Sequence, residues 1–276
     1  MVTRLDKRDV LGGLFGCWDE IDEVLAGLSD GQWREPTDLP GWRVQDVVSH
    51  IIGSESFLMG VPTPDPDCDV SALPHVHNET GAMNECWVRH LYDEPPGTML
   101  EKFRSVTSER RKALAAVGDD AWNEVSATPA GPDTYGRFMR VRTFDCWMHE
   151  QDIRYAVGVW ETDEVLAGAP AELALAEITS SLGYVVGKLG GAPDGSRVAF
   201  ELTGPLQRTI RVAVEGRARV VDEFDGDPTT TIRLDAVLFA RLAGGRTTAA
   251  ENMTAIGLDG DVDLGRQVTD RLTFVM

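Results

Sequence analysis

The sequence of 276 residues predicts an α+β protein in which a helical bundle precedes a smaller domain of mixed helices and strands. Two observations support this prediction. In the first part of the chain, apolar residues recur with the period of about 3.6 that marks an amphipathic helix. After residue 170, several stretches alternate apolar and polar side chains, the period-two pattern of a strand with one buried face. We therefore expect two domains, 1–165 and 166–276.

Five helices are expected in the first domain. The segment 6–28 has the clearest helical period, because Val10, Leu14, Trp18 and Ile21 fall on one side. Glycines and prolines break this pattern before the second helix begins. The segment 61–76 holds four prolines in sixteen residues and cannot be a regular helix, so we expect a long loop there. The remaining helices are expected at 43–59, 78–92, 97–117 and 137–158.

The second domain is expected to follow a linker at 158–170 and to begin with a helix at 171–189. Period-two stretches come next, and we interpret them as an antiparallel meander. Two further helices, near 236–243 and 260–274, are expected to close the chain. The predicted strands are 197–204, 208–215, 217–224 and 229–235.

Charge and composition limit the class of partner. The chain has 26 Lys and Arg against 45 Asp and Glu, a net charge of -19. Binding to the phosphates of nucleic acid or of an anionic membrane needs clustered cations, so this charge opposes both partners. No apolar run approaches the roughly 20 residues of a spanning helix, and the N-terminus lacks the apolar core of a secretion signal. We expect a cytoplasmic monomer or homodimer that binds neither nucleic acid nor membrane. Its four cysteines form no C-x-x-C pair and should be free thiols.

The stretch "RTFDCWMHEQDIR", residues 142–154, combines charged and large apolar side chains on one predicted helix. Positions three and four apart share a helix face, so Arg142, Asp145, His149 and Asp152 form one stripe. Apolar side chains occupy the other sides, and no wide polar face is left for solvent. We therefore expect a helix surrounded on most sides, with its charged stripe facing an enclosed polar cavity where charges must be paired or bound to a metal.

Asp145 and His149 stand at positions i and i+4, from which both side chains can reach one metal ion. A third ligand has to come from another element. His50 lies late in the second predicted helix, beside its apolar arc, and can face the interior of a bundle. Two histidines and one carboxylate suit Zn²⁺, Fe²⁺ or Ni²⁺ with open positions for water or substrate. The alternative is a plain helix pair, Asp145–His149, with His50 as a hydrogen-bonded core histidine.

Three motifs resemble the mycothiol-dependent maleylpyruvate isomerase family of the DinB-like superfamily. "PTDLPGWRVQDVVSHIIGSE" (36–55) resembles its opening motif, and "RVRTFDCWMHEQDIRYAVG" (140–158) resembles its second motif. "FARLAGGRTTAAENMTAIGLDGDVDLGRQV" (239–268) resembles its C-terminal domain. The resemblance implies a DinB-like four-helix bundle that binds metal, followed by a sterol-carrier-like α+β domain.

The motif positions imply that His50, Asp145 and His149 are the metal ligands. Members of the family commonly have Glu at the acidic position, and Asp145 is one methylene shorter, which leaves the metal open: zinc first, with nickel or iron as alternatives. Asp152 and Arg154 are implied to support the site, with Asp152 orienting a histidine or pairing with an arginine. A structural ion pair between helices is an equally good interpretation of both.

The resemblance implies a thiol-dependent enzyme that takes mycothiol as cosubstrate and a small electrophile as substrate. In the isomerase, the thiolate adds to a conjugated double bond, and rotation and elimination then give the trans isomer. Relatives that act as thiol S-transferases use the thiolate on another electrophile. The alternative is a non-catalytic protein that binds a metal or small ligand, with an apolar ligand site in the C-terminal domain. A third hypothesis is a scaffold in which the charged stripe only joins the helices.

Other residues are weaker candidates for the site. His75 and His77 stand where the proline-rich loop enters a helix, and they either cap the cavity or belong to a surface loop. Arg246, in the turn "AGGR", is a candidate for binding a substrate carboxylate through its two-pronged guanidinium. Cys146, beside the predicted ligands, either binds metal or packs as a small apolar side chain, and we favour packing.

Overall fold

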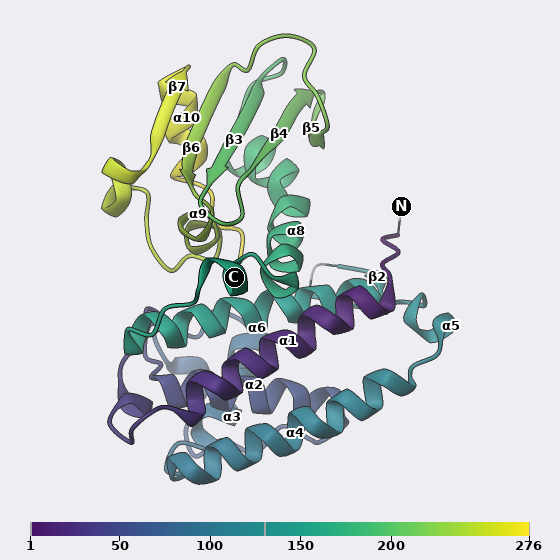
Figure 1. The fold of residues 1–276 in the computed structure, drawn as a ribbon, viewed down its shortest axis with the longest axis vertical. Coiled ribbons are helices and arrows are strands. Elements are labelled where there is room, and N and C mark those ends of the chain that lie inside the picture. The colour runs from purple at the N-terminus through teal and green to yellow at the C-terminus, as the bar shows by residue number, and fades with distance from the viewer. Residues whose placement is uncertain (1, 130, 276) are drawn as a thin grey trace. The chain divides into compact units, whose positions relative to one another are not determined.

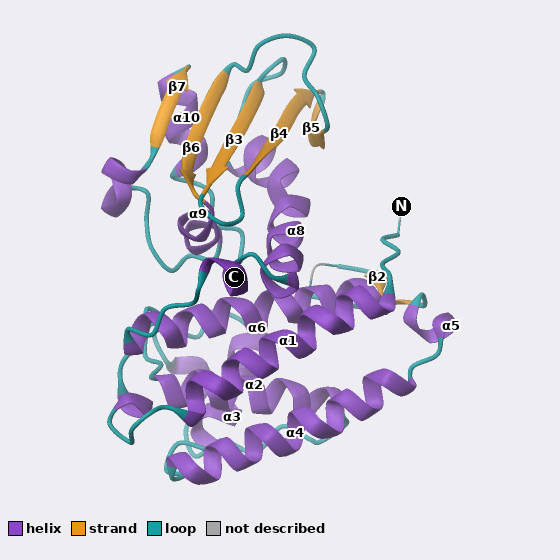
Figure 2. Cartoon of the chain, in the orientation of Figure 1, coloured by secondary structure: helices purple, strands orange, loops and turns teal. Residues whose placement is uncertain are grey.

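The computed structural model describes residues 2–129 and 131–275, which divide into two compact units, Met1–Trp160 and Glu161–Met276. The first unit is helical and the second contains a five-stranded sheet (Figures 1 and 2). The α+β class predicted from the sequence is confirmed. None of the helices in the described part of the chain combines the length and the apolar character needed to span a membrane.

Four long helices form the bundle of the first unit. Helix α1 packs against α6 and α4, and α2 packs against the same two helices, so that the four enclose one core. Helix α3 packs on the outer side of α2 (Figure 1). The bounds are α1 (Lys7–Ala26), α2 (Val44–Leu58), α3 (Glu79–His90), α4 (Pro96–Ala116) and α6 (Tyr135–Val157).

Side-chain caps set where two of these helices begin. The Asp46 carboxylate accepts a hydrogen bond from the backbone N–H of Arg43 at 2.8 Å, which satisfies a donor at the start of α2. The Thr134 hydroxyl accepts from the backbone N–H of Arg137 at 3.1 Å and caps α6. These caps fix the first residues of α2 and α6, the two helices that carry the candidate ligands.

Short elements connect the helices of the bundle. The proline-rich segment 61–76 is irregular except for one 3₁₀ turn, as its prolines predict. A two-stranded ribbon precedes α6 and was not predicted. These elements are η1 (Gln32–Arg34), η2 (Val70–Ala72), α5 (Asp119–Trp122), β1 (Val125–Ser126) and β2 (Asp133–Thr134).

Helix α6 runs through the interior of the protein. Every residue from Arg142 to Arg154 is buried except Asp145, whose side chain keeps 30% of its surface exposed. The expectation of a helix surrounded on most sides is therefore confirmed. Because an isolated buried charge costs several kcal/mol, each charged side chain on this helix needs a partner.

The second unit begins with two helices and a π-helical turn before its sheet. The strand order is β5-β4-β3-β6-β7, with β3 and β6 parallel and the other neighbours antiparallel. The elements are α7 (Asp163–Leu166), α8 (Ala169–Tyr184), η3 (Val185–Leu189), β3 (Arg197–Thr203), β4 (Arg208–Glu215), β5 (Arg217–Val221), β6 (Thr230–Asp235), α9 (Ala236–Ala243), η4 (Ala250–Ala255), β7 (Gly257–Gly260) and α10 (Val262–Thr269).

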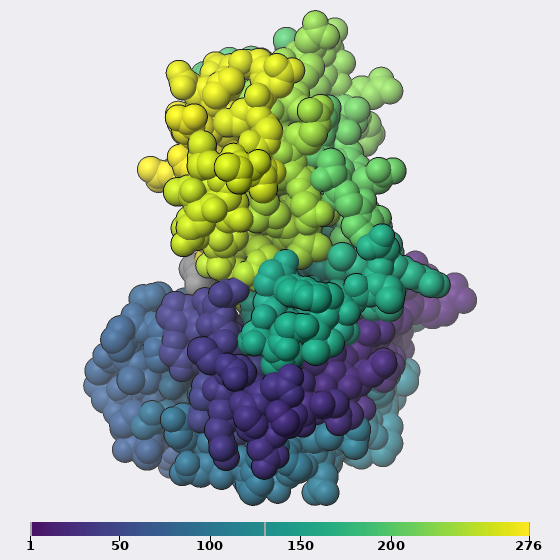
Figure 3. All heavy atoms as spheres, turned by 60° about the vertical axis from the view of Figure 1, so that its left-hand side comes forward, coloured from purple at the N-terminus to yellow at the C-terminus, as the bar shows by residue number. Residues whose placement is uncertain are grey.

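The predicted four-stranded meander was wrong at its last strand. Strands β3, β4 and β5 form a meander, but β6 returns to the other side of β3 and pairs with it in parallel. Three consecutive residues of β3, Val198 to Phe200, are buried, so both faces of this strand are covered, as is typical of a strand with a parallel neighbour in the interior of a sheet. Strand β7, which was not predicted, completes the sheet beside β6. The C-terminal residues of this unit, coloured yellow, lie on the face shown in Figure 3.

Candidate metal centre

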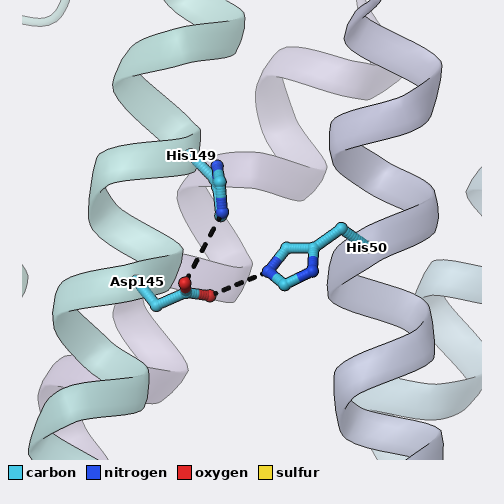
Figure 4. A group of neighbouring side chains, drawn as sticks. All are labelled: His50, Asp145 and His149. Carbon is cyan, nitrogen blue, oxygen red and sulfur yellow. Dashed lines mark hydrogen bonds and ion pairs between the residues drawn. The ribbon is translucent and has the colours of Figure 1, made fainter. Parts of the chain in front are cut away.

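Three side chains from two helices meet in the first unit (Figure 4). His50 projects from α2 toward α6, while Asp145 and His149 stand one turn apart on α6. The Nε2 atom of His50 lies 3.2 Å from Oδ2 of Asp145, and Nε2 of His149 lies 3.6 Å from Oδ1. Each residue offers one ligand atom, and these atoms lie within 4.8 Å of one another.

The donor set fits a divalent metal of the zinc type. Two imidazole nitrogens and one carboxylate oxygen converge, which leaves coordination positions for water or a thiol. Both histidines are buried, whereas Asp145 keeps partial exposure and marks the open side. The buried Nδ1 of His50 has no hydrogen-bond partner among the described residues, and its Nε2 faces the cluster.

The surroundings shift the three pKa values in different directions. Burial lowers the pKa of His50 despite the nearby Asp145. Burial also opposes the charge of His149, but Asp145 and Asp152 outweigh it and raise the pKa of this histidine. The pKa of Asp145 lies well below its usual value, because Arg142 and the two histidines outweigh the cost of burial. The carboxylate is therefore charged and ready to bind a cation.

A buried ion-pair network lies behind Asp145. Arg142 donates from Nη1 to Oδ2 of Asp145 at 2.6 Å and from Nη2 to Oε1 of Glu55 at 2.8 Å. Arg110 of α4 donates to the other oxygen of Glu55 at 2.9 Å. Glu55 is fully buried. The network links three helices and holds the Asp145 carboxylate in place.

Sequence reasoning missed Glu55 and Arg110 as supports of the site. A usable signal was present for Glu55, which stands on the same predicted helix as His50, at the end of the first motif. No comparable signal marks Arg110, which has several charged neighbours on α4. Only the packing of α4 against α2 brings Arg110 to Glu55.

Asp152 contacts one of the candidate ligands directly. Its Oδ2 lies 3.0 Å from Nδ1 of His149, and both side chains are buried. A carboxylate on Nδ1 fixes the orientation of the ring and turns Nε2 toward the cluster, the usual support of a metal-binding histidine. Asp152 is thus placed to orient His149.

Arg154 forms ion pairs within the bundle. Its Nε donates to Glu150 at 2.8 Å, and its Nη2 donates to Glu20 of α1 at 3.0 Å. These contacts join α6 to α1, which agrees with the structural interpretation of this arginine. Its part in the chemistry stays a prediction.

The remaining candidates lie in different settings. Arg246 belongs to the second unit and donates to the backbone oxygen of Gly244 at 2.7 Å, so its role toward the substrate stays a prediction. His75 is half-buried and contacts Glu85, while His77 is exposed. Cys146 is fully buried, and burial raises its pKa to about 12, which favours packing over metal binding.

Comparison with known families covers most of the chain. Residues 14–154 match the mycothiol maleylpyruvate isomerase N-terminal domain, and residues 172–267 match the C-terminal domain of the same family. Two uncharacterized proteins from strains of Mycobacterium tuberculosis are each 23% identical over 190 residues, which is 68% of this chain and 70% of theirs.

Solved structures show the same fold. The crystal structure of the mycothiol-dependent maleylpyruvate isomerase superposes with a TM-score of 0.60 and that of a histidine-to-alanine mutant with 0.58. Each is 16% identical and covers 92% of this chain and 93% of its own. A UbiJ-SCP2 ubiquinone synthesis protein matches 36% of this chain and 92% of its own, with 18% identity and a TM-score of 0.29.

Proposed function

The chain belongs to the mycothiol maleylpyruvate isomerase family, and we propose that it is a metal-dependent enzyme that adds a thiolate to a small electrophile. His50, Asp145 and His149 are the proposed ligands of Zn²⁺, with Ni²⁺ or Fe²⁺ as alternatives. Mycothiol is the proposed thiol cosubstrate. The observation that carries the proposal is the convergence of three ligand atoms from two helices, α2 and α6, supported by the buried partners Arg142 and Asp152.

A bound divalent metal would lower the pKa of a thiol and keep it as thiolate near neutral pH. The chain's own residues supply the geometry. Asp152 orients His149, and Arg142 holds Asp145 through one oxygen, so that the other oxygen stays toward His149. Glu55 and Arg110 fix Arg142 in turn. The proposed role of Arg246 is to bind a carboxylate of the substrate.

Two reactions fit this arrangement. In an isomerase, a carbon–sulfur bond forms at a conjugated double bond, the resulting single bond rotates, and loss of the thiolate restores the double bond in trans geometry. In an S-transferase, the carbon–sulfur bond is kept and a leaving group or the unsaturation is lost. Both reactions need the same thiolate, and the electrophile decides between them.

The non-catalytic alternative would place its ligand in an open groove of the second unit. This groove has a volume of about 760 Å³ and is lined by residues of α8, η3, β4 and β5. Apolar side chains such as Val214 and Val220 line it together with Lys188 and Arg217. A small amphipathic ligand could bind there without any reaction.

Metal content is the decisive measurement. Protein purified without a metal-affinity column and supplied with Zn²⁺ is expected to hold one divalent ion per chain. His149→Ala and Asp145→Ala are expected to lose it, because each removes a ligand. His90→Ala is the matched control, since His90 is exposed and outside the cluster. Wild-type protein that holds no stoichiometric metal would disprove the metal site.

Thiol consumption separates enzyme from binding protein. Metal-loaded protein is incubated with mycothiol and either maleylpyruvate or a chlorobimane, and loss of free thiol and formation of the trans isomer are followed. Isomer formation without net thiol loss identifies an isomerase, and thiol loss identifies an S-transferase. If metal is bound but neither signal appears with any acceptor, the binding alternative holds and the enzymatic proposal fails.

A further inference from the structure

The indole of Trp42 lies against both candidate histidines. Its ring centroid is 5.4 Å from that of His50 and 6.3 Å from that of His149, with interplanar angles of 36° and 37°. The two imidazoles meet edge to face at 4.8 Å. Trp42 is half-buried, so its ring forms an apolar wall beside the cluster and keeps part of its surface accessible.

A single buried carboxylate oxygen holds this indole in place. Glu85 of α3 is 4% exposed, and its Oε2 accepts a hydrogen bond from Nε1 of Trp42 at 3.0 Å. The same oxygen lies 3.1 Å from Nε2 of His75. A buried carboxylate requires such partners, and here the two come from different segments of the chain.

His75 connects this oxygen to the proline-rich segment. Its ring also lies close to Gly41, the residue before Trp42, where a Cβ would come within 2.8 Å of Nδ1. Gly41 has a φ of +82°, which favours glycine as well. His75 therefore contacts both the turn that carries Trp42 and the carboxylate that holds it.

We propose that His75, Glu85 and Trp42 form an interlock that ties the segment 61–78 to the histidine cluster, with Glu85 as the positioning residue. The interlock keeps the indole over His50 and His149 and makes it one wall of the space that a thiol or electrophile enters. A fixed apolar wall excludes water and strengthens electrostatic interactions inside the site. The geometry stands without a metal, and only the consequence for a bound metal rests on the proposed function.

A purely structural role for Glu85 makes a different prediction. In that case, loss of the carboxylate lowers stability but leaves the environment of the cluster unchanged once the protein is folded. The interlock instead predicts that changes at His75 and Glu85 alter the position of Trp42 relative to the histidines. The test therefore needs a signal from Trp42 itself.

Cobalt provides this signal, because Co²⁺ quenches the fluorescence of a nearby indole and absorbs visible light according to its ligand geometry. The chain has seven tryptophans. The fluorescence that Co²⁺ quenches in the wild type but not in Trp42→Phe is therefore the contribution of Trp42. We expect Glu85→Ala to lose most of this contribution and to shift the cobalt spectrum. Glu85→Gln keeps an oxygen acceptor and should restore both signals.

His75→Ala and His77→Ala form a matched pair in one loop. We expect His75→Ala to change the cobalt signals in the same direction as Glu85→Ala, and to speed cleavage by an aspartate-specific protease within 61–78 several-fold. His77→Ala should behave as wild type, since His77 is exposed. If folded His75→Ala and Glu85→Ala match His77→Ala in cobalt signals and cleavage rate, the interlock is disproved.

The two proposals can fail separately. If wild-type protein binds no Co²⁺, the proposed metal site fails, while cleavage of 61–78 and accessibility of Trp42 to acrylamide still test the interlock in metal-free protein. If Co²⁺ binds and quenches Trp42 in the wild type but His75→Ala leaves both the cleavage rate and this quenching unchanged, the interlock fails and the metal site stands.

Discussion

Glu55 is the residue on which two buried arginines of the bundle depend. Its two oxygens accept from Arg110 and Arg142, and all three side chains are buried. A buried ion pair is not by itself evidence of stability, but removing one member leaves an uncompensated charge in the interior. The contribution of Glu55 to stability is therefore measured by substituting it.

We expect Glu55→Gln to lower the free energy of unfolding by about 3–5 kcal/mol, because buried Arg110 loses its paired carboxylate and buried Arg142 is left with Asp145 alone. Urea unfolding in metal-free protein measures this. Glu109→Gln is the control, since the Glu109–Lys112 pair is on the surface and should matter little. Equal effects of the two substitutions would contradict the role given to the network.

His149 gives the metal-free protein a pH-dependent stability. Its pKa in the folded state is raised, whereas in the unfolded state it is about 6.5. The contact of the protonated ring with Asp145 and Asp152 therefore stabilises the fold fully below the unfolded value. This contribution is lost as the pH rises through the higher folded value.

The difference in unfolding free energy between wild type and His149→Gln should accordingly be larger at pH 6 than at pH 9 in EDTA-treated protein. Denaturant titrations across this range measure it. The same proton competes with a metal for the ring, so the apparent metal affinity of wild type should rise with pH. A stability difference that grows toward alkaline pH would contradict the assigned shift.

At the scale of elements, α2 and α6 matter because they present their ligands to each other. Helix α3 packs closely against α2. Gly53 makes this approach possible, since a Cβ there would come within 2.5 Å of the Trp87 Cβ. In contrast, Gly12 on α1 has no such neighbour within 4 Å.

We expect Gly53→Ala to destabilise the protein by about 1–3 kcal/mol, because the buried Trp87 must move to admit the methyl group. Gly12→Ala should instead stabilise it by about 0.5–1 kcal/mol, since alanine favours an exposed helix interior. Thermal and urea unfolding of both variants measure the contrast. A stabilised Gly53→Ala would mean that α2 and α3 do not pack as closely as described.

For the whole molecule, the division into two units separates metal binding from any contribution of the C-terminal domain. All three proposed ligands and their buried partners lie within Met1–Trp160. Arg246 and the groove beside β5 belong to the second unit. The two parts of the function can therefore be examined in separate fragments.

A fragment of residues 1–160 is expected to fold and to bind one divalent metal, because its core and ligands are its own. Circular dichroism and metal analysis check this, with the 161–276 fragment as a metal-free control. Turnover should fall in the 1–160 fragment if Arg246 binds the substrate. If metal binding is found only in the full chain, the site needs the second unit.

The local pattern of the sequence already determined the stripe on α6. Helix geometry places Asp145, His149 and Asp152 on one face, and helical spacing depends only on neighbouring residues. The five helices expected in the first domain and the α+β class follow from periodicity for the same reason. His50 was assigned from its helix and from a motif, and it is close to Asp145 in the structure.

Contacts between distant segments were decided only by the tertiary structure. The pairing of β6 with β3, the position of Arg110 beside Glu55, and the shared oxygen of Glu85 each join residues from separate elements. Period-two patterns fix which face of a strand is buried but not which strand lies beside it. A charged residue likewise does not indicate in sequence which helix will supply its partner. Local geometry therefore determined the ligand stripe, and long-range packing decided what surrounds it.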